Sequence, residues 1–365
     1  MSDVVPGYAN FDEILFSPAY AAECLEISTR ALRSFEDEEG VEVRRKSRGS
    51  VSARVYTPAD LFKIASIRRS KGLTRTLHRP LILSTFIQKG GTAKTTTSVN
   101  FAMYLGFKGL RVLVVDNDPQ GDATSMFGYD PDLTEKEVTE AGLSADRFVK
   151  GSLGNVIGIS SLFPPMTLAD VVKKPFGEFG PHLLPAEIGL EDMEVALSAA
   201  NNSDFRYAQF FNKGRKGELK QADLSCYDVI LIDNAPSGSL MTRNSMVASD
   251  MVLCPIRMDK FSCRALERLA GRLSTFAEEY QRCPQVAAIP TMFVKNRPRA
   301  IAHIAKISEM FPGNVTDSKL FQSEDYGKAL ELGLPLLAWQ SASENSAGAL
   351  RLVFGELLDR LLEIR

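Results

Sequence analysis

From Leu81 onward, continuous apolar segments alternate with amphipathic stretches along the chain. The apolar segments are 81–87, 111–118, 182–188, 227–236, 250–256 and 286–294. Unbroken runs of Val, Ile and Leu are typical of parallel strands that helices cover on both faces. The stretch 95–109 predicts a helix that ends at Gly109, and 346–365 predicts a final amphipathic helix. We therefore expect an α/β fold over residues 80–365, with a doubly wound, mostly parallel sheet.

The first 75 residues follow a different pattern. Ser17-Pro18 and Thr57-Pro58 each place a capping hydroxyl before a proline at the first helical position. Between them we predict a short helix over Pro18–Leu25, a tight turn at Glu26–Ile27 and a second helix capped by Ser28. Residues 41–57 then alternate and turn at Gly49, which favours a two-stranded wing. Residues 1–75 are therefore expected to form a small winged helix-turn-helix domain.

The local charge of the N-terminal region indicates what such a domain could bind. The whole chain has a net charge of −2, but residues 41–75 hold ten basic and two acidic residues, a local charge of +8. A helix in the major groove with arginines on the backbone is the usual arrangement of such a domain on DNA. The alternative is a small helical cap with a solvated charged face. The residues expected to contact DNA are Thr29, Arg30, Arg33, Arg44, Arg45, Lys46 and Arg48.

Composition excludes several other classes of protein. The chain is 44% hydrophobic and 24% charged, as expected for a globular protein with a sizeable core. Its five cysteines form no CxxC pair and it has three histidines, which disfavours a zinc site. No segment reaches the roughly 18 apolar residues of a membrane span, and the acidic N-terminus does not resemble a signal peptide. We expect a cytoplasmic protein.

The segment QKGGTAKTTT (88–97) lies between a predicted strand and a predicted helix, which is the context of a phosphate-binding loop. Gly90 and Gly91 would let the backbone approach phosphates, and the positive end of the helix would add to their attraction. Lys94 would contact the β- and γ-phosphates, and Thr95 would hold Mg²⁺. Ala93 stands where the ordinary pattern has glycine, which we expect to be tolerated only if its φ is negative.

Two carboxylates follow other predicted strands. Asp118 comes after the strand at 111–115, and Asp233 closes the strand at 227–233. In open α/β sheets the carboxyl ends of the strands form the ligand crevice. Asp118 can orient or deprotonate an attacking water, and Asp233 can hold Mg²⁺ through a water. Either residue alone would more simply be a helix cap or turn residue, but three strand ends carrying this set make that reading improbable.

These segments resemble a known family. KGGTAKTT, VLVVDNDPQGDATSMFG and YDVILIDNAPS resemble, in order, the loop and strand-end motifs of deviant Walker A ATPases of the ParA type. The resemblance runs from about Leu81 to the end of the chain, and the N-terminal region resembles the domain that precedes the ATPase in longer members. Two departures are Ala93 and the sequence Asn234-Ala235-Pro236, where relatives more often have an apolar residue and two prolines.

The resemblance implies a mechanism that the motifs alone do not. It implies that ATP and Mg²⁺ join two subunits and that Lys89, the extra lysine of the loop, reaches the partner's phosphates. It implies a dimer that binds DNA without reading its sequence, and hydrolysis that a ParB-like centromere-binding partner stimulates. It further implies a nucleoid-associated partition ATPase that represses its own operon. The implied nucleotide contacts are Lys89, Gly90, Gly91, Thr92, Ala93, Lys94, Thr95, Thr96 and Asn296, the last at the adenine.

Three alternatives remain open. A membrane-positioning ATPase that resembles the MinD type would need a terminal helix that docks on lipid, but the charges of 346–365 are mixed. A metallocluster carrier would need paired cysteines, and Cys254 and Cys263 do not have that spacing. A transcriptional repressor that senses ATP without significant turnover would be compatible with the departures at Ala93 and Asn234-Ala235.

Overall fold

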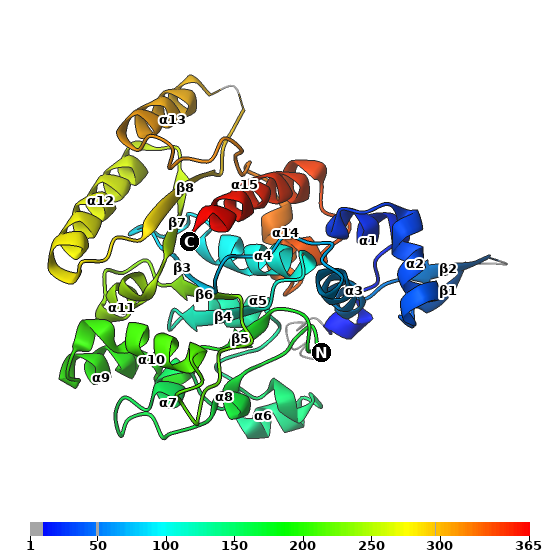
Figure 1. Ribbon diagram of the computed structural model, residues 1–365, viewed down its shortest axis with the longest axis horizontal. Helices are drawn as coiled ribbons and strands as arrows, with labels where there is room; N and C mark the ends of the chain where they lie inside the picture. The colour runs from blue at the N-terminus through cyan, green and yellow to red at the C-terminus, as the bar shows by residue number, and fades with distance from the viewer. Residues whose placement is uncertain (1–9, 49–50, 296) are drawn as a thin grey trace, which may run out of the picture.

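A parallel six-stranded sheet forms the centre of the molecule (Figure 1). The computed structural model describes residues 10–48, 51–295 and 297–365. The strand order is β5-β4-β6-β3-β7-β8, and every neighbouring pair is parallel. The strands are β3 (Leu81–Thr85), β4 (Val112–Asn117), β5 (His182–Leu184), β6 (Val229–Asn234), β7 (Met251–Arg257) and β8 (Gln285–Thr291).

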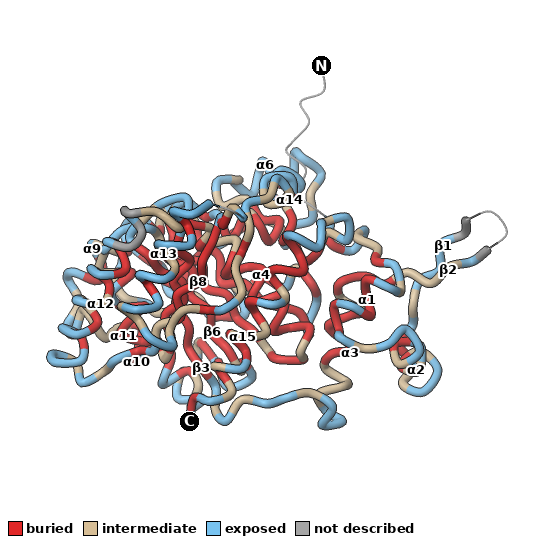
Figure 2. The backbone as a smooth tube through the Cα atoms, turned by 90° about the horizontal axis from the view of Figure 1, so that it is seen from above, coloured by how far each residue is buried: buried red, intermediate tan, exposed pale blue. Residues whose placement is uncertain are grey.

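Helices cover both faces of this sheet, which confirms the predicted doubly wound fold. The main helices after β3 are α4 (Lys94–Phe107), α5 (Asp122–Met126), α6 (Glu135–Glu140), α7 (Leu153–Ile157), α8 (Leu168–Val171), α9 (Met193–Ala199), α10 (Arg206–Arg215), α11 (Leu240–Ala248), α12 (Lys260–Tyr280), α13 (Pro298–Met310), α14 (Asp325–Glu331) and α15 (Ala349–Glu363). Leu81 and Leu83 pack on the side of α4 and α15, whereas Ile82 points to the side of α9, α10 and α11. All residues of β3, β4 and β6 are buried, and Figure 2 shows this buried interior beneath a mostly exposed surface.

The order of the strands in this sheet indicates where a ligand would bind. The chain passes from β3 across α4 to β4 on one side, and later from β6 to β7 on the other side of β3. Ligands of open α/β sheets bind at the carboxyl ends of the strands, at the point where the direction of winding changes. In this sheet that point is the end of β3, where the segment predicted to bind phosphate begins.

The N-terminal elements lie where the sequence predicted them. Helices α1 (Pro18–Leu25) and α2 (Thr29–Glu39) are followed by an antiparallel hairpin of β1 (Arg44–Arg48) and β2 (Val51–Val55), and then by α3 (Pro58–Ser70). The caps of the three helices are Ser17, Ser28 and Thr57. Glu26, between α1 and α2, adopts a left-handed conformation with φ of 51°. That this arrangement is a winged helix-turn-helix domain that binds DNA stays a prediction.

The N-terminal elements share a core with the sheet-containing part of the chain. Phe62 of α3 stacks on Phe107 of α4, with ring centroids 4.8 Å apart and an interplanar angle of 9°. Arg69 at the end of α3 forms a two-pronged ion pair with Asp228, directly before β6. Figure 1 shows α1–α3 beside α4, at the end of the molecule opposite to α12 and α13. Because the two parts share these contacts, the structure does not separate them into two independent domains. The boundary between residues 75 and 80 stays a prediction.

The apolar face of the final helix is occupied. Phe354 of α15 is buried and packs on Phe101 of α4 at a centroid distance of 5.0 Å. Leu350, Leu357 and Leu361 of the same helix are also buried. Burying one such side chain stabilises a fold by about 1.5–3 kcal/mol, so exposing this face to a lipid surface would be costly. Among the described residues, no helix combines the length and the apolar character that crossing a bilayer requires.

Candidate functional site

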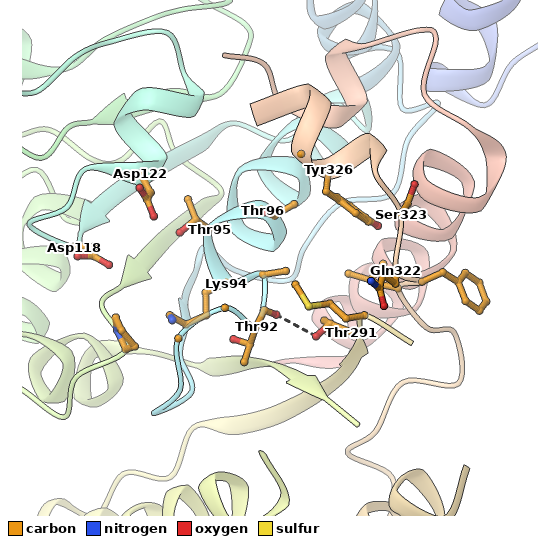
Figure 3. A pocket seen from close by; sticks show the side chains of 18 of the residues that line it. Thr92, Lys94, Thr95, Thr96, Asp118, Asp122, Thr291, Gln322, Ser323 and Tyr326 are labelled. Carbon is orange, nitrogen blue, oxygen red and sulfur yellow. Dashed lines mark hydrogen bonds between the residues drawn. The ribbon is translucent and has the colours of Figure 1, made fainter. Parts of the chain in front are cut away.

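A cavity of about 580 Å³ lies at the carboxyl end of β3 (Figure 3). The cavity is lined by the loop and first turn of α4, by the segments that follow β4 and β6, and by residues at and after the end of β8. These residues are Gly90, Gly91, Thr92, Ala93, Lys94, Thr95, Thr96, Asp118, Gln120, Asp122, Pro236, Thr291, Met292, Leu320, Phe321, Gln322, Ser323, Tyr326 and Gly327. The structure therefore brings seven of the nine predicted nucleotide-binding residues, and the predicted catalytic Asp118, to one cavity.

The expectation for Ala93 was wrong. Ala93 has φ of 67° and ψ of 36°, a left-handed conformation rather than one with negative φ. The loop must turn sharply here to bring its N–H groups around the phosphate site, and this path fixes the backbone whatever the side chain. A non-glycine residue in this region costs about 1–2 kcal/mol. The carbonyl of Ala93 accepts hydrogen bonds from the N–H and the hydroxyl of Thr97, at 2.9 and 2.7 Å, which helps to hold the conformation.

Lys94 provides a buried positive charge at the site. Its side chain is 8% exposed, and Nζ donates to the carbonyl of Lys89 at 3.3 Å. Burial lowers the pKa of Lys94, while Asp233, Asp118 and Asp122 oppose that effect. A lysine held among carboxylates within a cavity is suited to compensate the charge of a bound polyphosphate.

Asp118 lines the cavity beside the loop, on the side away from Gln322 and Tyr326 (Figure 3). It is 7% exposed, and its Oδ1 accepts a hydrogen bond from the N–H of Gln120 at 3.0 Å. Asp116 lies beneath it and accepts hydrogen bonds from the N–H and the hydroxyl of Thr124, at 2.8 and 2.7 Å. Asp116 therefore fixes the segment around Asp118, while Asp118 itself faces the cavity.

Asp233 and Thr95 fit a Mg²⁺ ion. Asp233 is fully buried under the first turn of α4, where the hydroxyl of Ser98 donates to its Oδ1 at 2.6 Å. Its Oδ2 has no hydrogen-bond partner, and burial raises its pKa to about 6. A buried oxygen without a donor suits a metal-bound water. Within the described residues, no group of three or more His, Cys, Asp or Glu residues could hold a metal ion.

Lys89 does not line the cavity. Its Nζ lies 2.8 and 2.6 Å from the two carboxylate oxygens of Asp259, which follows β7. Phe261 lies nearby, with its ring centroid 5.9 Å from Nζ. The lysine is thus at the edge of the site and is paired within its own subunit. Asn296, predicted to contact adenine, lies outside the described residues.

Sequence reasoning missed the part of the cavity formed by Thr291 and by residues 320–327. Thr291 ends β8, and its hydroxyl donates to the carbonyl of Thr92 in the loop at 3.1 Å. Gln322, Ser323 and Tyr326 point toward the same space (Figure 3). A second cavity of about 570 Å³ shares Phe321, Gln322 and Ser323 with the first and extends to the segment after β8. None of these residues belongs to a recognised motif. The apolar run at 286–294 indicated the strand that ends at Thr291, but no sequence signal indicated residues 320–327.

The residues predicted to contact DNA are distant from this cavity in sequence. Thr29, Arg30 and Arg33 are exposed on α2, and Arg44, Arg45 and Lys46 are exposed on β1. Arg48 belongs to β1, but its side chain lies outside what the structure describes. The hairpin projects from the body of the molecule beside α2 (Figures 1 and 2).

Comparison with known proteins identifies the family of the chain. Residues 81–285, more than half of the chain, match the model of the AAA_31 family, described as an AAA domain. The chain is 34% identical over 191 residues to the chromosome-partitioning ATPase Soj of Thermus thermophilus, covering 52% of this chain and 59% of that protein. It is 25% identical over 260 residues to the sporulation initiation inhibitor protein Soj of Bacillus subtilis, covering 71% of this chain and 91% of that protein.

A similar fold occurs in a solved structure of a synthase. The structure of cobyrinic acid a,c-diamide synthase from Mycobacterium smegmatis, with a bound ATP analogue and magnesium, superimposes with a TM-score of 0.59. The two chains are 22% identical, and the match covers 78% of this chain and 97% of the other. At this identity the likeness concerns the fold alone. On its family match and its Soj relatives, the chain belongs to the AAA_31 family of AAA domains and is a ParA-type P-loop ATPase.

Proposed function

We propose that this protein is an ATP-dependent partition ATPase that moves DNA. The observation that carries the proposal is the convergence of Lys94, Thr95 and Asp118 on one cavity, with Asp233 buried directly beneath. Each residue has the side chain that phosphoryl transfer to water needs at its place. The names of the Soj relatives, one of them a chromosome-partitioning ATPase, point to DNA as the cargo.

The nucleotide would bind with its phosphates in the first cavity. The N–H groups of residues 90–96 and the Nζ of Lys94 contact the phosphates, and the base extends toward Gln322 and the second cavity. Thr95 would hold Mg²⁺ directly and Asp233 would hold it through a water. When bound, Mg²⁺ neutralises charge that develops on the phosphate oxygens. Asp118 orients the attacking water and accepts its proton.

Lys89 would complete the site of a second subunit. Since Lys89 lies at the edge of its own cavity rather than in it, a partner that docks against this edge brings a cation to the other triphosphate. Such a contact depends on the γ-phosphate, so ATP favours the homodimer and hydrolysis releases it. A ParB-like centromere-binding partner would stimulate the slow turnover.

Two separate surfaces would contact DNA. The dimer would bind DNA without sequence preference through basic side chains of α12 and α13, where Arg264, Arg268 and Arg299 are exposed. Counterion release would drive this binding. The N-terminal residues on α2 and β1 would recognise an operator and repress the protein's own operon. This arrangement implies a nucleoid-associated, cytoplasmic protein with no membrane partner.

Phosphate release from ATP and Mg²⁺, measured with and without DNA, tests the proposal. Asp118→Ala should bind ATP but not hydrolyse it, and Lys94→Ala should lose both. A wild-type protein that binds ATP and an operator without any turnover would instead be a nucleotide-sensing repressor. Sedimentation with anionic liposomes and ATP tests the membrane-positioning alternative, which the buried apolar face of α15 disfavours.

A further inference from the structure

The amides of Asn117 and Asn234 form a buried pair at the carboxyl ends of β4 and β6. The two residues are register partners, with exposed fractions of 1% and 0%, and Asn117 Nδ2 donates to Asn234 Oδ1 at 2.8 Å. Neighbouring residues of a strand point to opposite faces of a sheet. Asp233 accordingly bonds to Ser98 of α4, whereas Asn234 bonds to Ser245 of α11. The amide pair therefore lies on the side of the sheet away from the magnesium-binding side chains.

Hydrogen bonds join this pair to two helices and to a third strand. Tyr207 of α10 is fully buried and donates its O–H to Asn117 Oδ1 at 2.8 Å. Ser245 Oγ donates to Asn234 Oδ1, also at 2.8 Å. Asn234 Nδ2 donates to the carbonyl of Thr85, the last residue of β3, at 3.3 Å. The network thus ties together the ends of the three strands from which the loops of the site depart.

Buried amides fix the relative position of the strand ends more strictly than apolar side chains would. A buried hydrogen-bonding group that loses its partner is penalised, so each amide holds its neighbour at one distance and angle. Apolar side chains of similar size would fill the same space and leave the strand ends free to shift.

We propose that Asn117, Asn234 and Tyr207 are positioning residues for ATP hydrolysis, which hold Asp118 and Pro236 in place beside the phosphate-binding loop. The inference rests on the proposed function. Asp118 follows Asn117 directly, Pro236 follows Asn234 by two residues, and both line the cavity. The three positioning residues act through the backbone, since none of them lines the cavity. A misplacement of about 1 Å at a reacting group can lower a rate by about 100-fold.

The chain offers a matched control for the tyrosine. Tyr227 is also a buried tyrosine, 4% exposed, and its hydroxyl bonds to Nδ1 of His182 at 2.8 Å. His182 is the first residue of β5 and Tyr227 precedes β6, so this pair lies at the amino ends of the strands. Tyr207→Phe and Tyr227→Phe each remove one buried hydroxyl with one short hydrogen bond. Their effects on unfolding should be similar, but only Tyr207→Phe should change the reaction.

The experiment measures the kcat and KM of ATP hydrolysis, the affinity for a fluorescent ATP analogue, and the urea unfolding midpoint. We expect Tyr207→Phe to lower kcat by about ten-fold with KM and affinity unchanged, and Tyr227→Phe to keep the wild-type kcat. The triple variant Tyr207→Phe/Asn117→Leu/Asn234→Leu removes both amides together with the tyrosine hydroxyl that bonds to Asn117, so it leaves no hydroxyl of this network without a partner and should fold with the same loss of kcat.

Equal kcat values for the two tyrosine variants, or wild-type turnover of the triple variant, would overturn the inference. Either result would leave the proposed function intact, because the wild-type protein would still hydrolyse ATP. A wild-type protein without turnover would overturn both, since there would be no reaction to position.

Discussion

Lys89 and Asp259 form an ion pair within one subunit, with Nζ 2.6 Å from Oδ2. The lysine that we propose to act across a dimer is therefore held by a carboxylate of its own chain. Both side chains are partly exposed, 25% for Lys89 and 35% for Asp259. Pairs with this exposure typically contribute about 0.2–1 kcal/mol. A triphosphate with several negative charges can displace such a carboxylate, so the pair can open when a nucleotide-loaded partner docks.

Lys89→Gln should separate nucleotide binding from assembly. Because Lys89 does not line the cavity, the affinity of the monomer for ATP should change by less than about three-fold. Association of subunits with a non-hydrolysable analogue should disappear, and turnover should fall by at least about ten-fold, as for other charges supplied in trans. Analytical ultracentrifugation and phosphate release measure the two effects. A variant that still forms dimers and hydrolyses ATP at the wild-type rate would contradict the role of Lys89.

Asp259→Asn should have the opposite effect on assembly. Removing the Asp259 carboxylate weakens the hold of its own subunit on Lys89, so the dimer should form at a protein concentration about two- to five-fold lower in the presence of the analogue. The matched control is Glu267→Gln, which removes one acidic charge from α12, where Glu267 is 3.7 Å from Lys306. If both variants shift the association constant equally, net charge rather than the Lys89 pair is responsible.

Ala93→Gly should stabilise the protein. Glycine adopts a φ of 67° without the contact that a Cβ makes there. After the greater flexibility of glycine in the unfolded chain is subtracted, we expect a gain of about 0.5–1 kcal/mol in the free energy of unfolding. Urea denaturation without nucleotide measures it. Ala305→Gly, in the middle of α13, is the control and should lose about the same amount. A loss at Ala93 as well would show that the left-handed backbone there is not strained.

Much of this architecture could be predicted from local patterns. The strands were visible as apolar runs, and the bounds of α1 and the cap of α2 followed from Ser17-Pro18 and Ser28. These signals are local, since a cap or a buried strand is encoded by a few adjacent residues. The side chains that complete the cavity were not visible, because Gln322 and Tyr326 reach it from a segment more than 220 residues after the phosphate-binding loop.

The backbone conformation of Ala93 and the ion pair of Lys89 could not be predicted from the sequence either. The sign of φ at Ala93 depends on the path that the loop takes between β3 and α4, which the residue itself does not determine. The partner of Lys89 is 170 residues away in sequence, and a surface aspartate carries no mark of such a pairing. The motif thus predicted which residues meet at the site, but not the conformations in which they are held.

His182 should make the protein sensitive to acid. The ring is 2% exposed, and burial lowers its pKa from 6.5 to about 4. Between these values the unfolded chain binds more protons than the folded one, so stability falls as the pH falls. This contribution should amount to roughly 2–3 kcal/mol between pH 7 and pH 4.5. Urea unfolding at both pH values should show a smaller difference for His182→Gln, whereas His78→Gln, which changes an exposed side chain, should behave as the wild type.

The N-terminal surface should bind DNA in two distinguishable ways. Arg45 is exposed on the projecting hairpin and Arg30 on α2, so we expect phosphate contacts from the first and base contacts from the second. Arg45→Ala should weaken binding to all sequences and reduce the slope of log K against log salt concentration by about 1. Arg30→Ala should weaken operator binding by about 1–3 kcal/mol and leave non-specific binding nearly unchanged.

The control for both variants is Lys136→Ala. Lys136 lies on α6 and its side chain is 83% exposed, so its removal changes the net charge by the same amount. Fluorescence anisotropy at several salt concentrations, with an operator fragment and with unrelated DNA, separates the effects. Equal losses for Arg45, Arg30 and Lys136 would mean that only the net charge matters. The N-terminal elements would then be a charged cap on the ATPase rather than a DNA-reading domain.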